Sequence, residues 1–307
     1  MKRFLGALAA KVLRRPLLLS HEEDADGIIS AALYVRVNPR AKVVLAKPQE
    51  IRREAKLNWL NWFTWDFVAD LPCPRKVKVR VDHHKTNPPC ASTEYYDPNA
   101  PSAAIMVLKV LGLNADEEAR RLAEISVETD TGNIRSEDAW LLNDAVKGAD
   151  YSSKVKLVYM LAKYGLRALE FKEVKEWIER NRKRREKSIK LIEAIPVRSL
   201  TVIEFDEDLD YSYRGMCIEL ERRGAEVTCI VVPRRRGFKV YLGSRRGSKY
   251  DVSAIALKLG GGGHKHAAGA VVKGPDEVYK ELKLMTGLKS IEVFEVGKEG
   301  IKGVRYI

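Results

Sequence analysis

The stretch LLLSHEEDADGIISAALYVRV (17–37) decides the fold, because a short apolar strand passes through an acidic loop directly into a helical pattern. A second apolar strand follows at 42–46, a third is expected to end near Asp66, and KVKVRV (76–81) leads into Asp82, His83 and His84. Ligands gather outside the carboxyl ends of strands in open α/β sheets. The acids and histidines that follow these strands are therefore expected to converge.

The length and composition bound the class of protein. The chain has 307 residues, enough for two domains, and is 45% hydrophobic and 32% charged. No apolar run approaches the roughly 20 residues that a bilayer needs, so neither a disordered polyelectrolyte nor a membrane protein fits. The four cysteines are scattered without a C-x-x-C pair. They suggest neither a zinc ribbon nor a disulfide scaffold, and they predict a reducing, cytoplasmic location.

The pattern along the chain predicts an α/β protein of two domains. We expect a parallel-sheet domain at 1–168, a helical linker at 169–196, a smaller α/β domain at 197–290 and an extension at 291–307. The linker follows from a charged helical pattern that ends at Pro196. The net charge is +13, and segments 171–191 and 232–249 carry 12 of these excess charges. This local excess favours a polyanionic partner.

The five histidines all lie beside acidic or glycine-rich loops. In SHEEDADGIIS (20–30), helix capping would explain Asp26 alone, but not His21, Asp24 and Asp26 together. Carboxylates and imidazoles without thiolates suit Mn²⁺ or Mg²⁺ better than structural zinc. Two such ions about 3.5–4 Å apart would need a ligand set of this size.

A glycine-rich segment, GGGGHKHAAGA (260–270), follows GSRRGS (243–248) in the second domain. Consecutive glycines let backbone N–H groups approach an anion, and arginines or His264 can donate to a phosphate. The alternative is a flexible turn, but four glycines lose much backbone entropy on folding, which favours the ligand site.

These motifs, in this order, resemble those of the DHH phosphoesterases that carry a DHH-associated C-terminal domain. D-A-D-G after a histidine, an aspartate before V-D-H-H, D-T-G and G-G-G-H span residues 17 to 270. The family includes RecJ-type exonucleases, NrnA-type oligoribonucleases and cyclic dinucleotide phosphodiesterases. The resemblance implies a parallel-sheet catalytic domain, a substrate-binding domain and two Mn²⁺ ions, with Mg²⁺ as the alternative.

The resemblance also implies roles for individual residues. The implied metal ligands are His21, Asp24, Asp26, Asp66, His83 and Asp130. The implied catalytic residues are Asp26, Asp82, His83 and His84. The implied substrate-binding residues are Arg245, Arg246, Gly261, Gly262, Gly263, His264 and His266. Two choices stay open, because Glu22 competes with His21 and Asp70 competes with Asp66.

The function that follows is a two-metal phosphodiesterase, with an exonuclease on single-stranded DNA, RNA or short oligonucleotides as the leading reading. A phosphodiesterase or phosphatase for a cyclic dinucleotide or a 3′-phosphoadenosine phosphate is the first alternative. A catalytically silent nucleic-acid-binding protein is the second. The expected partners are the nucleic-acid substrate and either a second copy of the chain or a replication or repair protein, with no membrane.

Overall fold

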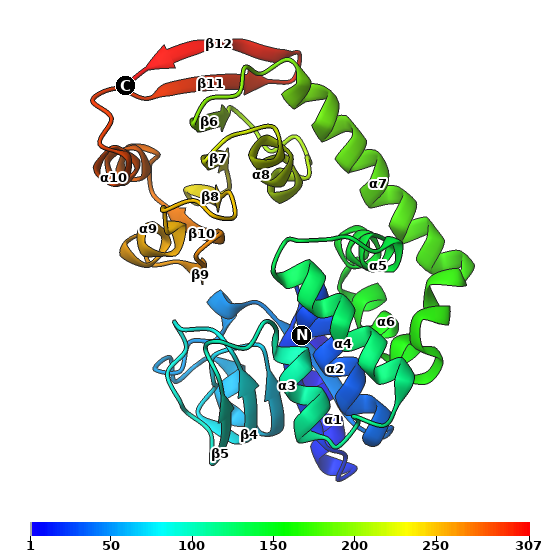
Figure 1. Cartoon of the computed structure of the whole chain (residues 1–307). Coiled ribbons are helices and arrows are strands. Elements are labelled where there is room, and N and C mark those ends of the chain that lie inside the picture. Colours follow the sequence, from blue (N-terminus) through cyan, green and yellow to red (C-terminus); the bar gives the residue numbers. More distant parts are fainter. Residues whose placement is uncertain (1) are drawn as a thin grey trace. The chain divides into compact units, whose positions relative to one another are not determined.

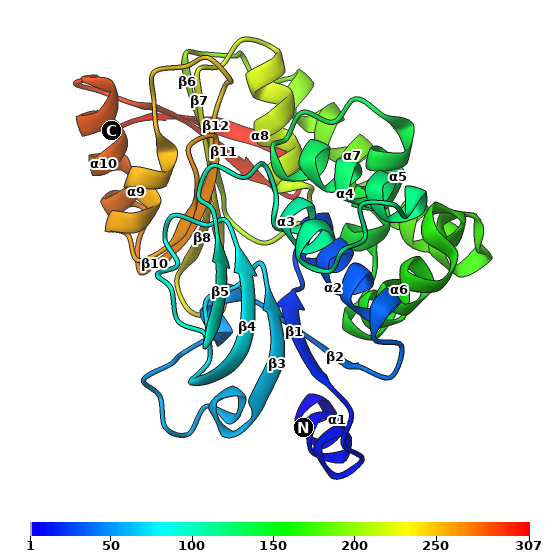
Figure 2. The same ribbon diagram turned by 60° about the horizontal axis from the view of Figure 1, so that its bottom comes forward.

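Five parallel strands form the first sheet of the computed structural model, which describes residues 2–307 (Figure 1). In sheet order they are β2 (Lys42–Ala46), β1 (Leu17–His21), β3 (Thr64–Ala69), β4 (Lys76–Asp82) and β5 (Thr93–Tyr96). They lie side by side in Figure 2. Because β2 and β3 flank β1 on opposite sides, the winding reverses at β1. A ligand crevice is therefore expected outside the carboxyl ends of β1 and β3.

The helices of the first unit bury an apolar core against this sheet. They are α1 (Lys2–Val12), α2 (Ala25–Val37), α3 (Ala103–Val110), α4 (Glu117–Asp130), α5 (Glu137–Gly148) and α6 (Tyr151–Tyr164), with 3₁₀ turns at Pro48–Glu50, Trp59–Trp62 and Gly165–Glu170. Ile28 and Leu33 of α2 are fully buried in the same cluster as Phe67 of β3. A second cluster joins Ala7 and Ala10 of α1 to Trp65. The sheet is thus covered by apolar packing on both faces, as parallel sheets usually are.

The second unit contains a mixed sheet of seven strands. In sheet order these are β12 (Gly300–Tyr306), β11 (Glu292–Gly297), β6 (Leu200–Phe205), β7 (Val227–Pro233), β8 (Phe238–Ser244), β10 (Ala267–Val272) and β9 (Gly262–His264). Its helices are α8 (Tyr213–Arg222), α9 (Val252–Lys258) and α10 (Asp276–Thr286). β11 pairs in parallel with β6, so the segment expected to be an extension belongs to this sheet. The α/β fold with two sheets matches the predicted fold class.

Helix α7 (Lys172–Glu193) runs from the first unit into the second. Val174 and Trp177 pack in the core of the first unit, whereas Ile192 packs in that of the second. The division between the compact units falls after Asn181, inside this helix. None of the helices in residues 2–307 has the length and apolar character needed to cross a bilayer.

Two of the four cysteines form a disulfide, which corrects the expectation from their spacing. Cys73 and Cys90 are bonded with their Cα atoms 5.9 Å apart, while Cys217 and Cys229 are free and buried. Cys73 lies between β3 and β4, and Cys90 lies between β4 and β5. The disulfide joins these two connections across a separation of 17 residues, which a search for local C-x-x-C pairs does not detect.

Candidate metal centre

The loop between β1 and α2 brings the first histidine and the first acids together. Asp24 caps α2, because its side chain accepts a hydrogen bond from the Gly27 backbone N–H at 3.1 Å. A Cβ atom on residue 27 would lie 2.4 Å from the carbonyl oxygen of His21, so only glycine allows this close approach. The turn holds Nδ1 of His21 2.9 Å from Asp24 Oδ2.

Asp26 is held by a helix from elsewhere in the chain. Its carboxylate oxygens accept hydrogen bonds from the backbone N–H groups of Ala103 and Ala104, at 2.7 and 2.8 Å. These groups belong to the first turn of α3, where the helix dipole favours a negative charge. The cap of α2 is therefore Asp24, and Asp26 is fixed for another role.

The structure places Asp70, and not Asp66, beside His21 and Asp24. Asp66 lies three residues before the end of β3, about 10 Å short of it at the usual rise per residue. Its carboxylate accepts hydrogen bonds from the Leu17 N–H and from Lys78 Nζ, at 2.8 and 2.7 Å. Asp70 follows the strand, with a left-handed φ of 57°, and its Oδ2 lies 3.2 Å from Nδ1 of His21. Strained residues of this kind cluster at functional sites.

The residues of the D-H-H triplet at the end of β4 make different contacts. Asp82 is fully buried and accepts hydrogen bonds from the backbone N–H groups of His83 and His84 and from the His84 ring, so it organises the turn. His83 Nδ1 lies 3.0 Å from the carbonyl oxygen of Ala100. Donation to that carbonyl leaves Nε2 as the lone-pair nitrogen, an arrangement typical of histidines that bind metals.

Among the sets of three potential ligand atoms that lie close together, two include residues of the segment 21–26. His21, Asp24 and Asp70 form one group, and Asp26, His83 and Asp130 form the other, with the atoms of each group within 4.8 Å of one another. The second group includes Asp130, the last residue of α4. Oδ1 of Asp70 also lies 3.7 Å from Nε2 of His83, so the Asp70 carboxylate reaches both groups.

The electrostatics of this cluster favour cations. Burial, reinforced by repulsion from neighbouring aspartates, raises the pKa of Asp26 to about 7, that of Asp70 to about 6 and that of Asp130 to about 7. Burial alone would lower the pKa of His21, but Asp24 and Asp70 raise it well above its usual value.

The donor atoms fit divalent ions. Among residues 2–307, Oδ1 of Asp70 and Nε2 of His21 are buried without a hydrogen bond. Oxygen and imidazole donors together suit Mg²⁺ or Mn²⁺. Glu22, the competitor of His21, belongs to neither ligand group in this part of the chain, and its N–H donates to the Ala46 carbonyl.

Several groups that shape the site carry no sequence signal. The start of α3, the Ala100 carbonyl and Asn87 all reach it through tertiary contacts. Nothing in the local pattern around any of them indicates a ligand or its support. Asp70 was detectable only as the neighbour of Asp66.

The residues expected to bind substrate lie in the second unit. Arg245 and Arg246 are exposed after β8, and Ser244 contacts Nδ1 of His266 through its hydroxyl and its carbonyl, at 3.0 and 3.1 Å. Part of the glycine run has a packing reason. A Cβ atom on Gly261 would lie 2.1 Å from the Gly269 carbonyl oxygen in the neighbouring strand. Gly262, Gly263 and His264 form β9.

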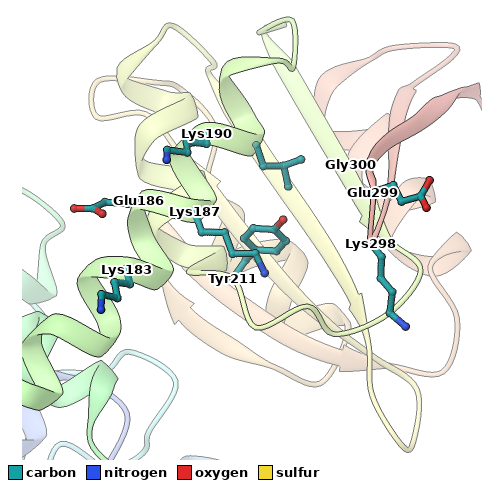
Figure 3. Close-up of a pocket in the computed structure, with 9 residues that line it drawn as sticks. Lys183, Glu186, Lys187, Lys190, Tyr211, Lys298, Glu299 and Gly300 are labelled. Carbon is teal, nitrogen blue, oxygen red and sulfur yellow. The ribbon is translucent and has the colours of Figure 1, made fainter.

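A separate basic pocket of about 440 Å³ lies on the second unit (Figure 3). Three lysines of α7, together with Lys298 and the ring of Tyr211, line it, beside Glu186 and Glu299. Lys187 Nζ lies 4.3 Å from the centroid of the Tyr211 ring. The pocket contains none of the residues expected to bind substrate.

Comparison with known proteins agrees with the motifs. No protein-family model matches the chain. It is 30% identical over 209 residues to the bifunctional oligoribonuclease and PAP phosphatase NrnA of Thermus thermophilus, a match that covers 64% of this chain and 59% of that protein.

Two solved structures share the fold. The pGpG-specific phosphodiesterase PggH of Vibrio cholerae is 19% identical, with a TM-score of 0.64 over 89% of this chain and 98% of its own. RecJ of Thermus thermophilus with Mg²⁺ is 16% identical, with a TM-score of 0.55 over 96% of this chain and 53% of its own. The chain is thus similar to NrnA in sequence and to PggH and RecJ in fold, which agrees with the resemblance of its motifs to those of the DHH phosphoesterases.

Proposed function

We propose that this protein is a divalent-metal-dependent phosphodiesterase that removes nucleotides from short single-stranded DNA or RNA. The observation that carries the proposal is the pair of ligand groups that Asp70 joins at the carboxyl ends of β1, β3 and β4. One ion would be held by His21, Asp24 and Asp70, and the other by Asp26, Asp70, His83 and Asp130. Two such ions supply a nucleophile at neutral pH and neutralise the charge that develops at phosphorus.

The protein's own residues would hold this centre rigid. The first turn of α3 fixes the Asp26 carboxylate, and the Ala100 carbonyl fixes the His83 ring. Asp82 orients His84, whose Nδ1 lies 2.9 Å away and which we expect to face the scissile phosphate. A preorganised arrangement of this kind loses little energy to reorganisation during the reaction.

The relatives support a nucleotide substrate. NrnA is named for oligoribonucleotides and PAP, PggH for pGpG, and structures of RecJ are described with Mg²⁺ and with Mn²⁺. We propose Mn²⁺ as the working ion, with Arg245, Arg246, His264 and His266 gripping the phosphate and terminal nucleotide. A catalytically silent protein is disfavoured because every metal-binding motif keeps its acids.

End-labelled DNA and RNA of graded length, from dinucleotides upward, test the proposal. Digestion should require Mn²⁺ or Mg²⁺ and stop in EDTA, and labelling each end in turn reports the polarity. His83→Ala should lose at least about 100-fold in rate, as expected when a ligand of the reacting centre is removed. Asp66→Asn is the matched control and should keep its activity. No metal-dependent hydrolysis of any length, or full activity of His83→Ala, would refute the proposal.

A further inference from the structure

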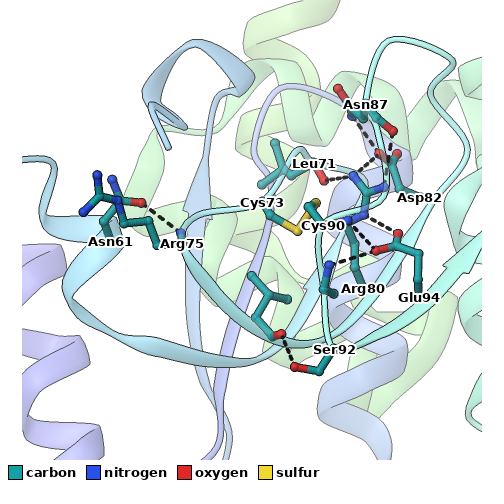
Figure 4. Close-up of a disulfide and its surroundings, with 12 residues drawn as sticks. Asn61, Leu71, Cys73, Arg75, Arg80, Asp82, Asn87, Cys90, Ser92 and Glu94 are labelled. Atoms are coloured by element: carbon teal, nitrogen blue, oxygen red, sulfur yellow. Dashed lines mark hydrogen bonds and ion pairs between the residues drawn. A yellow bond between two sulfur atoms is a disulfide. The ribbon is translucent and has the colours of Figure 1, made fainter. Parts of the chain in front are cut away.

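Arg80 of β4 is fully buried. Its side chain points toward Asp82, Asn87 and Glu94 (Figure 4). Its guanidinium donates to Asp82 at 3.1 Å, to Glu94 at 2.6 Å, and to the carbonyl oxygens of Leu71 and Asn87 at 3.4 and 3.3 Å. Burying a charge costs several kcal/mol unless it is paired and hydrogen-bonded. The four acceptors lie on two connections and two strands, because Leu71 precedes β4, Asp82 ends β4, Asn87 follows β4 and Glu94 belongs to β5. Arg80 therefore ties these segments together.

The Cys73–Cys90 disulfide joins the same segments. Glu94, which pairs with Arg80, also accepts hydrogen bonds from the backbone N–H groups of Cys90 and Ala91, both at 3.0 Å. Leu71, which accepts from Arg80, lies two residues before Cys73. We call one set of groups the clasp: the side chains of Arg80, Asp82, Asn87 and Glu94 together with the Cys73–Cys90 disulfide.

The clasp holds the two chain segments that carry Asp70 and His83. Asp70 directly precedes Leu71, and His83 directly follows Asp82. Within the clasp, Asn87 also donates to Asp82 at 2.7 Å, so the connection between β4 and β5 is tied back onto the D-H-H turn. A shift of either connection would therefore move Asp70 or His83 relative to the other.

We propose that the clasp positions Asp70 and His83 for divalent ions, so that opening its disulfide weakens ion binding and makes the centre sensitive to thiol reductants. This inference rests on the proposed function, because it concerns the ions of that centre. Arg80 acts through Asp82 and the connections, and is a positioning residue. In the reductive step a dithiol gives two electrons and two protons to the disulfide. The Cys73–Cys90 bond breaks to give two thiols, and the dithiol closes into its own disulfide.

A purely stabilising disulfide predicts something different. Closing a 17-residue separation lowers the entropy of the unfolded chain and is worth about 3 kcal/mol of stability. That contribution changes the melting temperature, but leaves the Mn²⁺ affinity of the folded protein unchanged. The Mn²⁺ affinity therefore separates positioning from stabilisation.

The experiment measures Mn²⁺ binding to the full chain by isothermal titration calorimetry, below the melting temperature of each sample. Oxidised protein is compared with protein reduced by dithiothreitol and desalted without oxygen, and with the Cys73→Ser/Cys90→Ser variant. Thiol titration in denaturant should find two thiols before reduction and four after it. We expect about 10- to 100-fold weaker Mn²⁺ binding in both open forms, the usual effect of losing outer-shell support. Reductant should not change the double variant further.

Arg80→Lys tests the other half of the clasp, because lysine keeps the charge but loses the planar fork. It should also weaken Mn²⁺ binding. Arg36→Lys is the matched control, since Arg36 makes a bidentate pair with Asp116 in the same unit, away from the ligands. It should lower the melting temperature and keep the Mn²⁺ affinity.

Two results would overturn the inference while leaving the function intact. One is wild-type Mn²⁺ affinity in the folded reduced protein and in Arg80→Lys, and the other is four thiols before reduction. Failure of the oxidised wild type to bind Mn²⁺ would overturn the proposed function as well. Should the double variant not fold, the reduced wild type still gives the comparison.

Discussion

Replacing Asp70 by asparagine should stabilise the metal-free protein and at the same time weaken its hold on Mn²⁺. Burial and the charges of Asp26 and Asp24 raise the pKa of Asp70 from 3.8 to about 6. A rise of about two units corresponds to about 3 kcal/mol, which ionised Asp70 costs the metal-free fold at high pH. Asparagine has no such charge, and it tolerates the left-handed φ of 57° that alanine would not.

The sign follows from the direction of the shift. A carboxyl whose folded pKa is raised contributes stability below its unfolded pKa, near 3.8, and loses it as the pH rises through about 6. Asp70→Asn should therefore differ most from the wild type in stability at pH 8, where we expect the melting temperature of the variant in EDTA to be about 5 °C higher than that of the wild type. At pH 4.5 the difference should be small.

Asp66→Asn is the companion variant for this measurement. It loses the ion pair with Lys78, so it should melt slightly lower in EDTA and bind Mn²⁺ like the wild type. Thermal melts at the two pH values and Mn²⁺ titrations at pH 8 are sufficient. The reasoning fails if Asp70→Asn keeps full Mn²⁺ affinity, if it melts lower than the wild type at pH 8, or if Asp66→Asn is the variant that loses the ion.

Three further predictions concern other parts of the chain. Gly27→Ala should lower the free energy of unfolding by about 1–3 kcal/mol and weaken Mn²⁺ binding, because its Cβ would clash with the His21 backbone. Gly6→Ala is the control and should fold normally, because its Cβ would meet mainly the end of the Lys42 side chain. Chemical denaturation and Mn²⁺ titration compare the two variants. Neutralising exposed Arg235 and Arg236 should reduce the salt dependence of single-strand binding by about 0.7 per lost phosphate contact in a plot of log K against log salt, with little effect on dinucleotides. In EDTA, the melting temperature should fall by about 5 °C from pH 5.5 to 8.5, because burial and mutual repulsion raise the pKa values of Asp26 and Asp130 to about 7. Added Mn²⁺ should reverse this trend. A melting temperature that does not change with pH in EDTA would contradict the prediction.

The local sequence was sufficient to indicate the candidate metal ligands that lie at or just after the end of β1. His21, Asp24 and Asp26 sit on one turn between a strand and a helix, and a short stretch of chain determines how such a turn runs. The same holds for Asp82 and His83 at the end of an alternating strand. Local patterns of this kind specify where a strand ends when a polar cluster follows it directly.

The third strand shows why the choice between Asp66 and Asp70 could not be made in this way. Asp66 is polar and follows aromatic residues, so the strand was expected to end there. Phe67, Val68 and Ala69 continue it, because all three are buried in the two cores that flank the sheet. Only the packing of both faces reveals that the strand ends three residues later.

Arg80 illustrates a different limit. In KVKVRVD (76–82) the basic residues alternate with valines, a pattern typical of a strand with one exposed face. Lys76 and Lys78 are indeed exposed, but Arg80 is fully buried. The connections joined by Cys73 and Cys90 cover this end of the strand, and a period-two pattern carries no information about them.

The cluster of aspartates also explains why ion binding and folding should be inseparable in this protein. Buried carboxylates with raised pKa values oppose the fold at neutral pH, and a bound cation removes that opposition. Ions that bind the folded state alone stabilise it further as their concentration rises above Kd. The unfavourable charge that makes the metal-free site costly is thus the charge that gives the site its affinity, and the ties from α3, Ala100 and the clasp are what keep the carboxylates together against their repulsion.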